Sequence, residues 1–113
     1  MPQRRRAEAP APVFAALGDE TRLRLLARLS SGEPMSISRL TAGSGMTRQG
    51  VTKHLRVLAG AGLVRGRRRG KESLWQLERQ RLEAARRSLE LISRQWEESL
   101  SKLKLFVESD RSD

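Results

Sequence analysis

Apolar residues recur at helical spacing through the first third of the chain. Residues 11–17 read as a short helix that Gly18 ends, and Asp19 is a favourable N-cap for a second helix over residues 21–31. One face of this second helix is apolar and carries Leu23, Leu26 and Leu29, with Leu25 beside them. Such a face predicts a helix that packs on a core on one side and meets solvent on the other.

The middle of the chain predicts a short extended segment and then two helices separated by glycines. The extended segment covers residues 35–37, the first helix covers residues 38–44, and Thr47 caps the second. Met46 and Val51 have the spacing of a hydrophobic staple, which fixes how the chain enters a helix. The apolar stripe of the second helix consists of Val51, Leu55 and Leu58.

Two strands and a long helix complete the pattern. Residues 63–69 and 72–77 predict a β-hairpin that turns at Gly70 and Lys71. No Gly or Pro interrupts residues 80–107, where apolar residues repeat in heptads, as in a helix that pairs with another helix. This seam has one polar gap, Ser99, and consists of Leu82, Ala85, Leu89, Ile92, Trp96, Leu103 and Phe106.

Positive charge gathers in the middle of the chain. The 113 residues carry 23 basic and 13 acidic side chains, which gives a formal net charge of +10. Residues 36–77 hold 9 basic residues and 1 acidic residue, whereas residues 78–113 hold 8 of each. A basic segment beside a balanced one predicts a surface that binds a polyanion.

The same composition excludes several kinds of site. The chain has no Cys, and His54 is its only His. A disulfide scaffold, a thiolate zinc site, a Cys nucleophile and a two-His metal site within one chain are therefore excluded. No set of nucleophile and base is evident, and no apolar run approaches the ~20 residues that cross a membrane. We expect a cytoplasmic protein that is not an enzyme and that uses no cofactor, metal or membrane.

Polar side chains lie opposite the apolar stripe of the helix that Thr47 caps. Helical geometry turns Gln49, Lys53 and Arg56 away from the stripe, with Thr52 at the edge of that face. In the major groove of DNA, Gln can pair with adenine, and Lys or Arg with guanine. The Arg-rich tip of the hairpin suits phosphates or a narrow minor groove. The expected DNA-binding residues are Arg48, Gln49, Thr52, Lys53, Arg56, Arg67, Arg68, Arg69 and Lys71.

These elements together predict a mainly α fold with a small β-hairpin wing. Two short helices joined by a Gly-containing turn and followed by a hairpin form a winged helix-turn-helix, to which the long C-terminal helix adds a dimerisation element. The expected organisation is a disordered basic arm over residues 1–10, a DNA-binding domain over 11–77, a dimerisation helix over 78–108 and a tail over 109–113.

Three stretches of the sequence together resemble the ArsR family of bacterial winged-helix repressors. They are LGDETRLRLLARL, VTKHLRVLAGAGLV and RGRRRGKESLWQL, and the resemblance covers residues 13–77. It implies a homodimer that binds an imperfect palindrome, with groove-contacting positions at Gln49, Thr52 and Lys53. It also implies a structural role for His54. Because the family uses its first helix in the interface as well, the expected dimer residues are Val13, Phe14, Leu82, Leu89, Ile92, Trp96, Leu103 and Phe106.

The sequence also departs from relatives that sense metals or arsenicals. Where such relatives have a C-x-C-D motif, this chain has Ser36, Ser38 and Arg39. A second kind of metal site in the family uses Asp and His ligands on the C-terminal helix, and residues 78–113 contain no His. The resemblance is therefore to a metal-independent branch of the family.

We therefore expect a sequence-specific regulator of transcription that represses from a palindromic operator in double-stranded DNA. Two other functions fit parts of the sequence. A basic architectural protein for DNA or RNA would bind without a palindrome and would lose little specificity when Gln49 is changed. An interaction module would use residues 78–113 to hold a different protein, with DNA binding secondary. The sequence indicates no effector.

Overall fold

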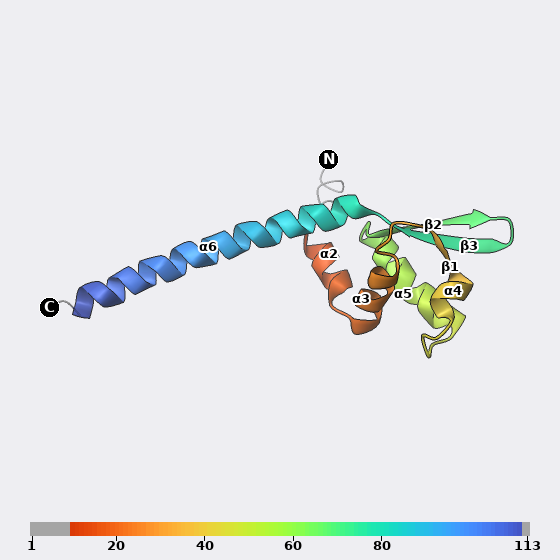
Figure 1. Cartoon of the computed structure of the whole chain (residues 1–113), viewed down its shortest axis with the longest axis horizontal. Helices are drawn as coiled ribbons and strands as arrows, with labels where there is room; N and C mark the ends of the chain where they lie inside the picture. Colours follow the sequence, from red (N-terminus) through yellow and green to blue (C-terminus); the bar gives the residue numbers. More distant parts are fainter. Residues whose placement is uncertain (1–9, 112–113) are drawn as a thin grey trace.

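The computed structural model describes residues 10–111, in which helices dominate and one small sheet forms the wing (Figure 1). The helical body and the sheet lie together, and the last helix leaves them as a long rod. The elements, in chain order, are α2 (Pro10–Leu17), α3 (Glu20–Arg28), β1 (Met35–Ser36), α4 (Ile37–Thr41), α5 (Arg48–Gly60), β2 (Val64–Arg69), β3 (Glu72–Leu77) and α6 (Arg79–Arg111). This order and arrangement confirm the winged helix-turn-helix fold.

The core forms where α5 meets the other helices and the sheet. The predicted stripe of Val51, Leu55 and Leu58 is confirmed, because all three side chains are fully buried. Leu29 and Leu40 bring α3 and α4 onto the same cluster. Since burying a Leu side chain stabilises a fold by about 1.5–3 kcal/mol, this cluster fixes the orientation of α5.

Side-chain caps set the starts of three helices. The Asp19 carboxylate accepts a hydrogen bond of 3.0 Å from the backbone N–H of Arg22 at the start of α3. The Thr47 hydroxyl accepts one of 3.0 Å from the backbone N–H of Gly50 at the start of α5. Both predicted caps are thereby confirmed, and Ser36 adds a third cap at the start of α4.

The face of α3 that packs on the core differs from the prediction. Leu25, Leu26 and Leu29 are buried, but Leu23 is 50% exposed. At about 100° per residue, the three buried leucines define a face that leaves Leu23 outside it. The helix also ends at Arg28, where Leu29 forms the C-cap, instead of continuing through residue 31.

Other predicted boundaries also shift. Helix α4 ends at Thr41 rather than at residue 44, and a turn follows in which Gly43 has a φ of +73°. Pro10, expected in the arm, belongs to α2, and residues 109–111, expected in the tail, belong to α6. The rest of the predicted arm and tail, residues 1–9 and 112–113, lies outside the described residues.

The wing is an antiparallel sheet of three strands in the order β1-β3-β2. The predicted hairpin is confirmed, with Arg69 opposite Glu72 and with Gly70 in the turn at a φ of +63°. Of the extended segment predicted over residues 35–37, Met35 and Ser36 form a strand of the same sheet, in which Met35 pairs with Trp75 of β3, whereas Ile37 begins α4. This pairing joins the wing to the helical body.

Gly66 has no side chain and therefore leaves space for the indole of Trp75 on the sheet. The two residues are directly opposite each other in the β2–β3 register. A Cβ atom at position 66 would lie 2.9 Å from Cζ3 of Trp75, which is closer than such atoms approach. The indole, which also packs on the core, therefore requires a residue without a side chain across from it.

We predict that Gly66→Ala lowers the free energy of unfolding by about 1–3 kcal/mol, because the new methyl group displaces Trp75 from a filled site. Gly60→Ala is the matched control, since a Cβ atom there meets nothing within 4 Å and Ala favours a helix over Gly. Chemical denaturation followed by tryptophan fluorescence measures both variants. Equal stabilities of the two variants would contradict this account of Gly66.

Candidate nucleic-acid interface

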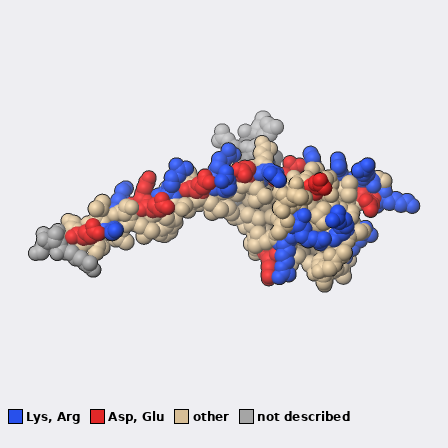
Figure 2. Space-filling model, viewed as in Figure 1, with Lys and Arg blue, Asp and Glu red and all other residues tan. Residues whose placement is uncertain are grey.

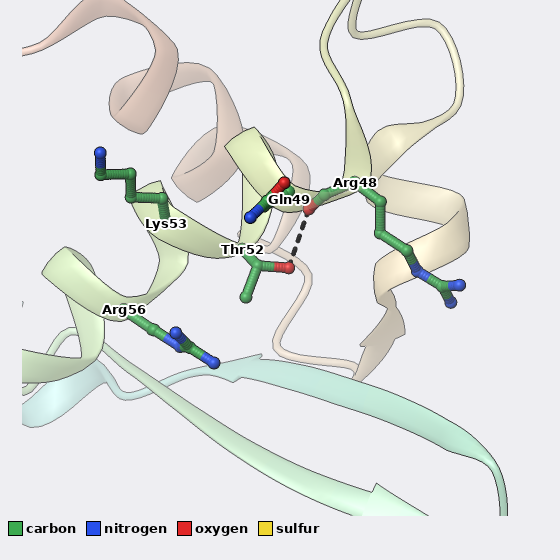
Figure 3. Close-up of a pocket in the computed structure, with 5 residues that line it drawn as sticks. All are labelled: Arg48, Gln49, Thr52, Lys53 and Arg56. Atoms are coloured by element: carbon green, nitrogen blue, oxygen red, sulfur yellow. Dashed lines mark hydrogen bonds between the residues drawn. The ribbon is translucent and has the colours of Figure 1, made fainter.

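The exposed face of α5 brings together all five helix residues predicted to bind DNA. They line one open hollow on the protein surface (Figure 3). The cap at Thr47 and the buried stripe hold the helix from the opposite side, so this face is turned to solvent. The residues are Arg48, Gln49, Thr52, Lys53 and Arg56.

These five side chains are not equally available to a ligand. A guanidinium nitrogen of Arg48 donates a hydrogen bond of 3.1 Å to the hydroxyl of Ser38, and Figure 3 shows this side chain turned away from Lys53 and Arg56. The Thr52 hydroxyl donates to the Arg48 carbonyl oxygen at 2.8 Å. Within residues 10–111, the side chains of Gln49, Lys53 and Arg56 have no hydrogen bond or ion pair to the rest of the chain. The face therefore offers one amide and two free cations.

The wing carries a second group of cations. Arg67, Arg68, Arg69 and Lys71 are all exposed around the turn of the hairpin. Successive residues of a strand point to opposite faces, so Arg68 lies on one face of the wing while Arg67 and Arg69 lie on the other. Arg65, on the same strand, differs because its guanidinium lies 3.1 Å from the Glu78 carboxylate. The tip thus presents positive charge on both faces.

The distribution of charge separates the body and wing from α6. Figure 2 shows Lys and Arg gathered over the body and at the end of the wing, whereas basic and acidic residues alternate along α6. On α6 the charges pair with each other, as where Arg86 contacts both Glu83 and Glu90. The excess positive charge therefore lies on the helix-turn-helix and wing.

The side chain of Arg22, on α3, connects this helix to α2 and α5, a role that the sequence did not indicate. Its Nε donates to the Ala16 carbonyl oxygen at 2.6 Å, at the end of α2. Its Nη1 lies 3.4 Å from Nδ1 of His54 on α5. His54 Nδ1 is also 3.8 Å from the Asp19 carboxylate. The predicted structural place of His54, at the border of the buried stripe, agrees with these contacts.

The Asp19 carboxylate is stabilised in its ionised form. The hydrogen bond from the Arg22 backbone N–H is the main cause that lowers the pKa of Asp19 below its ordinary value of 3.8. The nearby charges of Arg22 and His54 lower the pKa further, while desolvation works in the opposite direction. The negative charge at this position also suits the start of α3, where the helix dipole is positive.

Comparison with known proteins agrees with this geometry. Residues 17–67 match the sequence model of the helix-turn-helix domain. The HTH-type transcriptional regulator Rv2034 of Mycobacterium tuberculosis is 31% identical over 105 residues, which cover 93% of this chain and 94% of that protein. An ArsR-like transcriptional regulator from Rhodococcus sp. RHA1 superimposes with a TM-score of 0.74 and 35% identity over 86% of this chain and 91% of that one.

The chain belongs to the ArsR-like family of helix-turn-helix transcriptional regulators. It is therefore a DNA-binding regulator of transcription and not an enzyme. A further similar structure is the homodimeric winged helix-turn-helix domain of Mb0332 from Mycobacterium bovis, a possible ArsR-family regulator, with a TM-score of 0.57 and 27% identity over 80% of each chain. In this ArsR-like regulator, no helix among residues 10–111 has the length and apolar character to cross a membrane.

The serines at the position of the family's cysteine motif make hydrogen bonds within the fold. The Ser36 hydroxyl accepts a hydrogen bond from the Arg39 backbone N–H, and the Ser38 hydroxyl accepts one from Arg48. Over residues 10–111, no three residues of the types His, Cys, Asp and Glu are grouped so that they could hold a metal ion. Ser36 thus caps α4, and Ser38 connects α4 to the first residue of α5.

The residues predicted for a dimer interface fall into two groups. Val13 is 2% exposed and belongs to the core of its own chain, so its place in an interface, expected from the resemblance, is not available in this fold. Phe14 and Leu82 are half-buried against the same core. The remaining residues are on the outside of α6 and are exposed: Leu89, Ile92, Trp96, Leu103 and Phe106.

We predict that Asp19→Asn destabilises the regulator at neutral pH. The difference in stability between this variant and the wild type should narrow as the pH falls. Asn retains the cap, so the variant removes mainly the charge. Because the folded-state pKa is lowered, the stabilisation is fully present above the ordinary pKa of 3.8 and is lost as the pH falls through the folded-state value. Urea midpoints measured between neutral and acidic pH test this.

Glu20→Gln is the control for this prediction, since it removes an exposed charge at the next position, where the carboxylate pairs only with exposed Arg24. We expect a smaller loss of stability for this variant. If the difference in stability between Asp19→Asn and the wild type stays constant across the pH range, the loss of the carboxylate charge is not its cause.

Proposed function

We propose that this ArsR-like regulator is a repressor that binds a palindromic operator as a homodimer, with α5 as the recognition helix. The observation that supports this most directly is the exposed face of α5, where Gln49, Lys53 and Arg56 have no partner within the described chain and lie together in one hollow. Because its ligand is DNA, its proposed place of action is the cytoplasm.

The chemistry of α5 fits the major groove. The Gln49 amide can donate to and accept from adenine, and the cations of Lys53 and Arg56 can reach the acceptor edge of guanine. Thr52 has its hydroxyl hydrogen committed to the helix backbone, which leaves its methyl group for contact with thymine. Arg48, held by Ser38, suits the phosphate backbone at the edge of the groove.

The wing supplies contacts outside that groove. Arg67, Arg68, Arg69 and Lys71 can neutralise phosphates beside the site or enter a narrow minor groove. Neutralising phosphates adds affinity for any DNA sequence, whereas contacts to base edges carry the specificity. We therefore assign sequence reading to α5 and non-specific anchoring to the tip of the wing.

The proposed dimer uses α6. Its exposed seam of Leu89, Ile92, Trp96, Leu103 and Phe106 is unpaired in a single chain, and the related Mb0332 domain is homodimeric. A twofold dimer presents two recognition helices, which fits a palindromic operator. In this proposal residues 11–77 are the DNA-binding domain and residues 78–108 the dimerisation helix.

We also propose that the regulator responds to no metal or arsenical through thiolate ligands, since the chain has no Cys. Soft ions such as arsenite and Cu(I) select thiolates. We predict that arsenite, zinc or copper at micromolar concentration does not release the protein from its operator in a mobility-shift assay. Stoichiometric release in the absence of aggregation would contradict this proposal.

We predict that Gln49→Ala and Arg68→Ala weaken DNA binding in different ways. The loss of Gln49 should cost about 1–3 kcal/mol on the operator and little on a scrambled duplex. The loss of Arg68 should weaken both duplexes by similar factors and reduce the slope of log K against log salt by about 0.9. Binding titrations of each variant on both duplexes across a salt series measure these effects.

Gln80→Ala and Arg94→Ala are the matched controls, because they make the same changes on exposed positions of α6. Neither control should alter the affinity. If Gln49→Ala weakens both duplexes equally, α5 does not read the sequence, and a basic architectural protein that binds DNA without a palindrome becomes the better description.

A further inference from the structure

A cavity of about 250 Å³ lies beside α3, the turn that follows α4 and the start of α5, and we call it the α3 cavity. Leu25, Leu40 and Val51 form its floor, and these three side chains are buried in the core. Met46, which precedes α5, lines it as well. The α3 cavity shares no residue with the hollow on the exposed face of α5. A ligand bound there would contact the helix-turn-helix without covering the face proposed to bind DNA.

The rim of the α3 cavity is positively charged. Among the residues that line the cavity, Arg24 and Arg28 are basic and none is acidic. The two arginines are four residues apart on α3, a spacing that places side chains next to each other on one face of a helix. Guanidinium groups bind carboxylates through paired, charge-assisted hydrogen bonds. The rim therefore favours a ligand that carries a carboxylate.

The two guanidinium groups differ in how firmly the protein holds them. Arg28 donates hydrogen bonds of 2.8 Å to the carbonyl oxygens of Arg39 and Leu40 on α4. Arg24 pairs with Glu20 at 2.6 Å, and these two side chains are 73% and 79% exposed. An ion pair so exposed contributes little to stability. A ligand carboxylate can therefore replace Glu20 beside Arg24 at little cost, while Arg28 is already fixed in place.

The floor and the volume of the α3 cavity define the rest of the ligand. An enclosed apolar cavity of ~150 Å³ holds one benzene molecule, so this larger cavity has room for a single ring with a short charged group. The phosphates of DNA carry charge but no apolar surface, so they would leave the aliphatic floor without a partner. Floor and rim together fit a small molecule with an apolar ring at one end and a carboxylate at the other.

We propose that the α3 cavity binds a small aromatic carboxylate that acts as an effector of this regulator. The carboxylate accepts hydrogen bonds from Arg24 and Arg28, and the ring lies against Leu40 and Met46. The bound effector lowers the affinity of the protein for its operator. The statement about the operator rests on the proposed function, whereas the ligand site depends only on the fold.

Charge and position give the direction of this effect. The effector brings a negative charge to a domain whose excess positive charge attracts DNA. The wall of the cavity includes Gly43 and Ser44 of the turn between α4 and α5, so the effector touches the segment that leads into the proposed recognition helix. Because the effector and DNA are both anions, each weakens the binding of the other. Thermodynamic linkage makes the two factors equal.

Nuclear magnetic resonance of the methionine methyl groups tests the site on the full chain without DNA, with benzoate as the probe. Met46 lines the cavity, whereas Met35 is buried in β1 and does not line it. Benzoate should shift the Met46 signal in a saturable way, with a Kd of about 0.1–1 mM for so small a ligand. The Met35 signal is the internal control and should not move. Met46→Leu and Met35→Leu assign the two signals.

Matched ligands and variants separate the two parts of the site. Benzyl alcohol has the ring without the charge, and inorganic phosphate has the charge without the ring, so each should bind at least about tenfold more weakly than benzoate. Arg24→Gln should weaken benzoate binding about fivefold or more. Arg94→Gln makes the same change at an exposed position of α6 and should have no effect. Thermal unfolding verifies that both variants are folded.

Binding titrations on the operator duplex test the regulatory effect. Saturating benzoate should lower the affinity of the wild type for the operator about fivefold or more. Sodium acetate at the same concentration keeps the ionic strength equal, which matters because salt alone weakens DNA binding. At a benzoate concentration that half-saturates the wild type, Arg24→Gln should lose less affinity for the operator than the wild type does.

The outcomes separate this inference from the proposed function. A Met46 signal that does not respond to benzoate, or that responds equally to phosphate, overturns the site. Equal benzoate binding by Arg24→Gln and the wild type overturns the role of the rim. Benzoate binding that leaves the affinity for the operator unchanged overturns the regulatory effect. A protein that binds benzoate at Met46 but discriminates no operator from a scrambled duplex overturns the proposed function and leaves the ligand site intact.

Discussion

The burial of one side of α5 is the constraint on which the rest of the fold depends. Three aliphatic side chains of that helix are removed from water, and the helices and sheet around it are arranged to cover them. Burial of one face of a helix necessarily exposes the other. The same hydrophobic contacts that stabilise the domain therefore decide which polar residues lie on the face proposed to bind DNA, so stability and the proposed recognition share one cause.

The local features of the fold could be read from the sequence. Asp19 and Thr47 act as caps through hydrogen bonds within their own first turn, and the hairpin register follows from a turn of two residues. The helix face that gathers Gln49, Lys53 and Arg56 depends only on helical periodicity and on the buried stripe opposite. Such features need no information about distant parts of the chain.

The features that escaped prediction depend on contacts between distant segments. The pairing of Met35 with Trp75 joins residues that are far apart in sequence, and the exposure of Leu23 depends on how α3 packs on its neighbours. Val13 lies in the core of its own chain, and its burial depends on the packing of α2 on α3, α5 and α6. Which residues pair across the proposed α6 interface is a property of two chains, which no single-chain pattern contains.

The position of Arg22 has a consequence for regulation. The Arg22 guanidinium donates a hydrogen bond to the end of α2 and lies against His54 in the middle of α5. It therefore connects the helix beside the proposed subunit contact to the proposed recognition helix. Any event that moves one of these helices relative to the other changes the free energy of these contacts. Thermodynamic linkage then makes the effect reciprocal. If DNA binding changes the affinity between the subunits by some factor, association of the subunits changes the affinity for DNA by the same factor.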